Sequence, residues 1–236
     1  MPGEQEFVLP IETRTAERDG NVDLYFPDGD GPHPAIVFVH GGPLPVEKQP
    51  RPREWPVFRG YGSLAALRGV VGVTLDHRLY DPFAYPAAAE DVAAAVELVR
   101  KDPRVDADRV ALWFFSGGGP LLAEWLRTPP SWLKVLAATY PLLGSMAGWD
   151  IEARFLPAEA VAEAGDVPIV LTRVGRERPE LAALVEAFVE AARARGAQVE
   201  IVDVPNGQHA FDMLDHTEES REAVEAAFAK VLARLS

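Results

Sequence analysis

Residues 109–126 read RVALWFFSGGGPLLAEWL: an apolar run, a glycine-rich turn and a second apolar run. The first run, 109–115, has the length and composition of a buried strand. Ser116 stands where that strand ends, and three glycines follow it. After the glycines, Leu121, Leu122, Trp125 and Leu126 have the spacing of an apolar helix face. A strand, a tight turn and a helix in succession form the repeating unit of an α/β protein.

Short apolar strands and amphipathic helices alternate on both sides of this stretch. We expect strands at 35–39, 70–75, 109–115, 133–139, 167–172 and 199–204, and helices at 86–101, 181–195 and 217–235. Thr217 with the acidic residues after it supplies a helix-capping start. Strands that are apolar on both faces belong to parallel sheets covered by helices, so we predict an open, twisted, mostly parallel sheet with right-handed crossovers and helices on both faces.

An antiparallel hairpin is expected ahead of this sheet. Its strands are predicted at 7–11 and 21–26, with Asp19-Gly20 as a turn signal between them. The sheet would then contain about eight strands. No linker or composition break divides the chain, so 1–236 is expected to be a single domain. About 25 residues separate Tyr140 from Val167, which leaves room for a short cap at about 141–166 but not for a large lid.

Charge and composition exclude several classes of function. A net charge of −13 disfavours nucleic acid and anionic membranes as partners. The chain has no cysteine, and its N-terminus lacks the basic start and apolar run of a signal peptide. No apolar stretch approaches the ~18 residues of a membrane span, so we expect a cytoplasmic protein with no membrane partner. The histidines have no metal-ligand spacing, and neither a phosphate loop nor a dinucleotide motif is present, so no metal and no cofactor are expected.

Three reactive side chains follow strands of the predicted sheet, in the order serine, acid, histidine. Active sites of open α/β sheets gather outside the carboxyl ends of the strands, which is where Ser116, Glu177 and His209 stand. A serine hydroxyl needs a neighbouring base, and that base needs an acid to hold its tautomer. We therefore expect Ser116 as nucleophile, His209 as general base and Glu177 as the acid, with Asp150 as the alternative acid.

The order serine, acid, histidine, with the turn His40-Gly41-Gly42-Pro43 after the first parallel strand, resembles the α/β-hydrolase fold family. The resemblance is to its dienelactone-hydrolase-like and small carboxylesterase branch. Asp76-His77-Arg78-Leu79 is similar to the Asp-Tyr-Arg-Leu run of esterases, and 209–212 is similar to their catalytic-histidine segment. The resemblance implies an α/β-hydrolase fold and a serine hydrolase that cleaves a small carboxylic ester or similar acyl bond through an acyl-enzyme on Ser116.

The backbone around the serine is expected to stabilise the negative charge that develops on the substrate oxygen. The N–H of Gly117, at the start of a helix, is one candidate donor, and the N–H of Gly42 is the other, with Gly41 as an alternative. Trp55 and Phe115 are expected to bind substrate as walls of the pocket. His40 is expected to orient the glycine-rich turn.

A second histidine, His77, is expected in a buried polar cluster with Asp76 and Arg78. One position departs from the family pattern Gly-x-Ser-x-Gly, because Phe114 replaces the first glycine. Small residues normally relieve crowding at such a turn, so Phe114 predicts an altered turn.

Phe114 also leaves a second reading open, a catalytically silent hydrolase-fold protein that binds a small ligand. A serine peptidase of the proline-iminopeptidase or prolyl-oligopeptidase type is another alternative, because the turn at 40–43 also resembles theirs. Those enzymes carry a large cap or an added propeller, for which this chain has no room. A homodimer stays open from the sequence.

Overall fold

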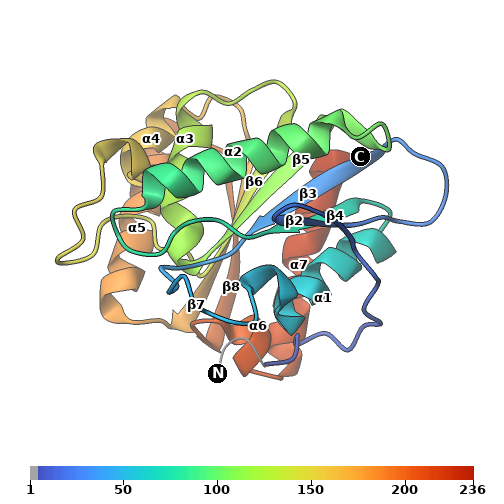
Figure 1. Ribbon diagram of the computed structural model, residues 1–236. Helices are drawn as coiled ribbons and strands as arrows, with labels where there is room; N and C mark the ends of the chain where they lie inside the picture. The colour runs from blue at the N-terminus through green and yellow to red at the C-terminus, as the bar shows by residue number, and fades with distance from the viewer. Residues whose placement is uncertain (1–4) are drawn as a thin grey trace.

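A computed structural model describes residues 5–236, in which eight strands form one sheet (Figure 1). The strand order is β1-β2-β4-β3-β5-β6-β7-β8. β3 to β8 run parallel to one another, β2 pairs antiparallel with β4, and β1 pairs antiparallel with β2 at the edge. The predicted mostly parallel sheet with an N-terminal antiparallel hairpin is confirmed. The strands are β1 (Glu17–Asp19), β2 (Val22–Tyr25), β3 (His33–Val39), β4 (Val71–Leu75), β5 (Val105–Phe115), β6 (Leu133–Thr139), β7 (Ile169–Arg176) and β8 (Val199–Gln208).

Helices cover both faces of the sheet and bury a separate apolar core on each (Figure 1). Successive residues of β3 alternate between the two cores: Val37 belongs to the first, and Ile36 and Phe38 belong to the second. Residues of α2, α3 and α5 contribute to the first core, and residues of α1 and α7 to the second. The helices are α1 (Pro56–Leu67), α2 (Tyr85–Lys101), α3 (Leu122–Arg127), α4 (Pro157–Ala160), α5 (Pro179–Arg195), α6 (Phe211–Leu214) and α7 (Glu218–Leu235).

The predicted start of the last helix is confirmed. The Thr217 hydroxyl accepts a hydrogen bond from the backbone N–H of Ser220, which satisfies one of the free donors of the first turn. Among residues 5–236, no helix has the length and apolarity needed to cross a membrane.

The prediction of the first hairpin strand at 7–11 is wrong. The strand that pairs with β2 is β1, and Gly20 in the turn between them has φ +57°. Phe7 instead packs on the Tyr61 ring of α1, with 4.8 Å between ring centroids, and the N–H of Val8 donates to the carbonyl of Asp212. An apolar run of this length can be buried without joining a sheet, because burial alone does not supply ladder partners.

Residues 141–166, where a short cap was expected, contain α4 and two short 3₁₀ turns, Ala153–Phe155 and Val161–Glu163. The Phe155 side chain is fully buried and its ring lies 5.7 Å from that of Tyr85. This segment therefore packs into the first core. That the whole chain forms one domain stays a prediction.

Candidate functional site

Ser116 occupies a strained turn at the carboxyl end of β5. Its φ is +48°, in the left-handed region that residues other than glycine rarely adopt. A 3₁₀ helix, Ser116–Leu121, follows, and α3 starts only at Leu122. Gly117 therefore lies at the start of a helix, as expected, but this first helix is of the 3₁₀ type. Three glycines favour helix poorly and Pro120 lacks an N–H, so regular i→i−4 bonding starts later.

The glycines after Ser116 allow another turn to approach it closely. A Cβ on Gly117 would lie 1.8 Å from the carbonyl oxygen of Gly42, and a Cβ on Gly118 would lie 2.6 Å from that of His40. Neither contact is possible for a side-chain carbon. The turn after β3 and the turn after β5 thus pack backbone to backbone because side chains are absent there.

Phe114, the residue that departs from the family pattern, is fully buried in the first core. In the sheet register it lies between Val39 on β3 and Ala138 on β6, and the small Ala138 leaves space beside it. Its side chain points to the face opposite that of Phe115, which belongs to the second core. The left-handed turn at Ser116 forms with this bulky residue in place.

Ser116, His209 and Glu177 form a chain of hydrogen bonds. Oγ of Ser116 lies 2.7 Å from Nε2 of His209, and Nδ1 of His209 lies 2.5 Å from Oε2 of Glu177. Each residue directly follows the end of a strand, β5, β8 and β7 respectively, because β7 and β8 each extend four residues beyond the predicted ends at 172 and 204. Asp150, the alternative acid, is exposed in the segment after β6.

The environment of Glu177 favours its ionised form. Its side chain is only 6% exposed, and this burial by itself would raise its pKa. The hydrogen bond and charge of His209, with the N–H of Arg178 donating 2.8 Å to Oε1, outweigh burial and lower the pKa of Glu177. A carboxylate at Nδ1 fixes a proton on that nitrogen, which leaves Nε2 free to accept one from Ser116.

The oxyanion donors were expected in the turns of Gly117 and Gly42, and the structure brings these two turns together. A Cβ on Gly41 would lie 2.9 Å from the Ser116 Cβ and 3.3 Å from the Gly117 nitrogen, so this turn covers the serine. The Tyr85 hydroxyl donates 2.9 Å to the carbonyl of Gly117 and so holds that peptide in place. Its sequence position alone does not mark Tyr85 as part of the site.

His40 and His77 are both buried, and their pKa values are lowered. Burial is the main cause in each case; the neighbouring His77 lowers the pKa of His40 further, and the pKa of His77 falls to about 4. Nδ1 of His40 donates to the carbonyl of Gly41 at 2.5 Å, so His40 orients the glycine-rich turn as expected. The predicted cluster of His77 with Asp76 and Arg78 is wrong. Asp76 instead forms an ion pair with Arg53, and the half-exposed Arg78 forms one with Asp91.

An apolar cavity of about 220 Å³ lies in front of Ser116 and His209. Trp55 and Phe115, the two residues expected to bind substrate, both line it. Trp55 is fixed by its indole N–H, which donates to the carbonyl of Pro50. The other lining residues are Gly41, Gly42, Pro43, Leu44, Phe58, Tyr140, Ala210 and Met213. None of these comes from residues 141–166, so the expected cap contributes nothing to this wall.

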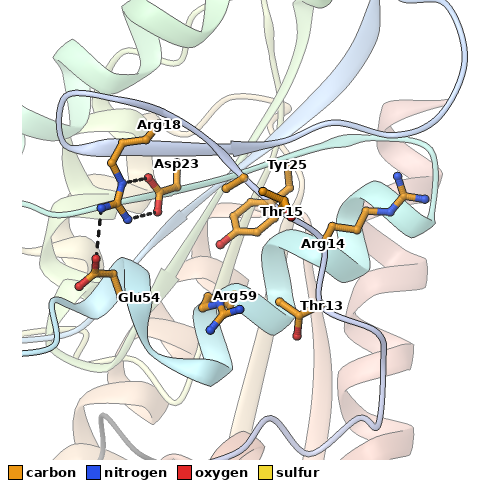
Figure 2. Close-up of a pocket in the computed structure, with 9 residues that line it drawn as sticks. Thr13, Arg14, Thr15, Arg18, Asp23, Tyr25, Glu54 and Arg59 are labelled. Carbon is orange, nitrogen blue, oxygen red and sulfur yellow. Dashed lines mark hydrogen bonds and ion pairs between the residues drawn. The ribbon is translucent and has the colours of Figure 1, made fainter.

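A second, larger cavity of about 380 Å³ lies away from Ser116, between residues 13–18, β2 and the start of α1 (Figure 2). Its wall is charged. In Figure 2 the guanidinium of Arg18 bridges Asp23 and Glu54, and the hydrogen bond to Asp23 Oδ1 measures 2.7 Å. None of Ser116, His209 and Glu177 lines this cavity, so the smaller apolar one is the candidate active site. Within residues 5–236, no group of three potential ligands could hold a metal ion.

Several solved structures resemble this chain. A bacterial heroin esterase aligns with a TM-score of 0.76 at 17% identity, over 91% of this chain and 79% of that chain. EstE1, a thermostable carboxylesterase from a metagenomic library, aligns with a TM-score of 0.74 at 23% identity, over 96% and 92%. Esterase 2 of Thermogutta terrifontis, phosphorylated by paraoxon, aligns with a TM-score of 0.69 at 18% identity, over 99% and 95%. These likenesses show the α/β-hydrolase fold that the sequence predicts.

Family comparisons place the sequence more closely. The model of the BD-FAE family matches residues 22–125, and the model of the dienelactone hydrolase family matches residues 75–236. No curated protein matches the sequence significantly. The dienelactone hydrolase match spans more than half of the chain and includes all three residues of the hydrogen-bonded chain described above. This protein is an α/β-hydrolase enzyme that belongs to the dienelactone hydrolase family.

Proposed function

We propose that this chain is a serine esterase that cleaves small carboxylic esters through an acyl-enzyme on Ser116. The observation that carries the proposal is the continuous hydrogen-bonded chain from Ser116 through His209 to Glu177, with 2.7 Å and 2.5 Å links. Such a chain activates a hydroxyl that is otherwise a weak nucleophile. Esterases among the structural neighbours support the choice of an ester bond.

The proposed reaction has two halves. In the first, His209 takes the proton of Ser116 while Oγ attacks the ester carbonyl, and the carbonyl oxygen becomes an oxyanion facing the N–H groups of Gly117 and Gly42. His209 then gives the proton to the departing alcohol, and the acyl group stays on Ser116. In the second half, His209 takes a proton from water, the hydroxide attacks the acyl-enzyme, and the acid leaves as Ser116 recovers its proton.

The cavity supports a small and uncharged substrate. Most of its lining residues are aromatic or aliphatic, and none is an aspartate, glutamate, lysine or arginine. His209 and Tyr140 are the ionisable residues that line it. A volume of about 220 Å³ is below the range of ~300–1,000 Å³ typical of ligand pockets, which disfavours long acyl chains.

A fluorophosphonate probe tests the nucleophile. It should label the wild-type protein at Ser116, and Ser116→Ala should stay unlabelled with an unchanged circular dichroism spectrum. Failure of the folded wild type to react would support the silent ligand-binding alternative and overturn the proposal.

Two chromogenic substrates test the bond. We expect hydrolysis of p-nitrophenyl acetate, weaker hydrolysis of the decanoate and none of Pro-p-nitroanilide. Faster cleavage of the anilide than of the acetate would favour the peptidase alternative instead.

A further inference from the structure

A buried carboxyl group that the proposed triad does not use lies three residues after His209. Asp212 is fully buried, and burial raises its pKa to about 6, although two tyrosine hydroxyls oppose this shift. The Tyr61 hydroxyl donates to Oδ2 at 2.9 Å, and the Tyr140 hydroxyl donates to Oδ1 at 2.8 Å. Burying a carboxyl group costs free energy, and here two tyrosine hydroxyls are arranged to offset that cost. We therefore ask what this buried group does for the site.

One of the two tyrosines also contacts the general base. The ring centroid of Tyr140 lies 4.9 Å from that of His209, with 56° between the ring planes. Tyr61 belongs to a cluster of aromatic rings around Phe38, Trp113 and Phe228, in the second core. Both tyrosines thus bind the same carboxyl group from within the second core, but of the two it is Tyr140 whose ring contacts the imidazole.

Tyr140 is fixed at both ends. Its φ is +38°, its N–H donates to the carbonyl of Thr172 on β7, and its hydroxyl is held by Asp212. Two residues later, the N–H of Leu142 donates 2.8 Å to the carbonyl of Ser116. The segment after β6 therefore ties the serine turn to the ring that packs on the histidine.

Electrostatics gives this contact a role in the proposed reaction. His209 becomes an imidazolium each time it takes the serine proton, and the face of an aromatic ring attracts a cation within ~6 Å. A phenol that donates to a carboxylate gains electron density in its ring, and the Asp212 carboxylate itself adds a negative charge behind that ring. Both effects favour the imidazolium over the neutral imidazole.

We propose that Asp212 and Tyr140 are positioning residues, with the buried carboxylate holding the Tyr140 ring against His209 to orient it and stabilise its protonated form during turnover. This inference rests on the proposed Ser116–His209 chemistry. It assigns no proton transfer to Asp212, which acts through Tyr140.

Tyr140→Phe and Tyr61→Phe form a matched pair. Each variant keeps the aromatic ring and removes one of the two hydroxyls that donate to the Asp212 carboxyl group. With p-nitrophenyl acetate and active sites titrated by fluorophosphonate, Tyr140→Phe should lower kcat about fivefold and leave KM within about twofold. Tyr61→Phe should lower kcat less than about twofold, although both variants lose thermal stability. Equal losses of kcat in the two variants, in step with their melting temperatures, would overturn the proposal.

Asp212→Asn supplies a second measurement, because the amide keeps an acceptor and removes the charge. We expect kcat to fall about tenfold, and the double variant Asp212→Asn with Tyr140→Phe to be no slower than Asp212→Asn alone, since both act along one path. Multiplicative losses in the double variant would show that the two residues act separately and would contradict the inference.

A readout without turnover separates this inference from the proposed function. The ring-proton NMR signals of His209, assigned by their loss in His209→Gln, should shift in Tyr140→Phe and stay in place in Tyr61→Phe. If the probe does not label the protein but the NMR pattern is as expected, the proposed esterase function is overturned and the positioning of His209 by Tyr140 is retained. Unchanged His209 signals in Tyr140→Phe would overturn the positioning even in an active esterase.

Discussion

The imidazole rings of His40 and His77 stack with 3.7 Å between their centroids and 10° between their planes. Nε2 of His77 donates 3.0 Å to the carbonyl of His40, while Nε2 of His40 accepts from the N–H of His77 at 3.4 Å. Nδ1 of His77 in turn accepts from the N–H of Leu79 at 3.4 Å. Each ring therefore has one accepting nitrogen, which requires both rings to be neutral, since a protonated ring has no acceptor nitrogen. A stacked pair of neutral histidines therefore supports the turn that faces Ser116.

The first prediction is that acid destabilises the protein through this pair. The folded chain holds the pKa of His77 at about 4, whereas an unfolded histidine titrates near 6.5. Between these values the unfolded chain takes up a proton that the folded chain refuses, so stability falls as pH falls. His77 alone should cost about 2 kcal/mol between pH 7 and pH 5, measured by urea unfolding. His77→Gln should flatten this pH dependence, and the exposed control His216→Gln should not.

Asp212 should affect stability with the opposite sign. Its pKa is raised to about 6 in the folded chain, so the folded chain binds a proton more tightly than the unfolded chain does between pH 4 and pH 6. Stability from this group is thus present at low pH and lost as pH rises. The free energy of unfolding of the wild type, relative to Asp212→Asn, should fall by about 2 kcal/mol from pH 4 to pH 7. A difference that stays constant with pH would contradict the raised pKa.

Gly117→Ala should abolish most activity without preventing folding of the sheet. The new Cβ would meet the carbonyl of Gly42 at 1.8 Å, so the two turns must separate and the proposed oxyanion donors move apart. Loss of one such donor costs about 10²–10³ in kcat. Gly144→Ala is the control, because its Cβ would meet only the flexible end of Leu184. Esterase assays of both variants, with equal far-ultraviolet circular dichroism, check the prediction.

Glu177→Gln should lower kcat by about 10²–10⁴, because the amide can leave His209 in the wrong tautomer. KM should change little, since Glu177 does not line the cavity in front of Ser116. Asp150→Asn, at the exposed alternative position, should retain wild-type kcat. The reverse pattern would assign the acid to Asp150.

The sequence predicts the sheet well because buried parallel strands leave wholly apolar runs. All six predicted parallel strands are confirmed, although β7 and β8 each extend four residues beyond their predicted ends. Ser116, Glu177 and His209 could be named in advance because each lies at or shortly after the carboxyl end of a predicted strand. The prediction of a hairpin strand at 7–11 was wrong because this apolar run is buried without pairing with β2. Phe7 packs on Tyr61 of α1, and the N–H of Val8 donates to the carbonyl of Asp212.

The network around Asp212 could not be predicted, because its donors are distant in sequence. Tyr61 and Tyr140 lie 151 and 72 positions from Asp212, and only the packed chain brings them together. A weak signal was present: Tyr140 directly follows β6, the strand between those that position Ser116 and Glu177. The packing of the turn after β3 on the turn after β5 likewise depends on close backbone contacts, of which the sequence shows only the glycines.

The apolar cavity in front of Ser116 is built from two groups of residues with different freedom to vary. The glycine turns touch backbone to backbone, so a substitution there disturbs the reacting atoms themselves. Leu44 and Met213 line the same cavity from a loop and from α6. Substitutions at Leu44 and Met213 can therefore change which ester the cavity accepts during evolution, while the residues that carry out the reaction stay the same. A mutant library that aims at new substrates should begin at these two positions.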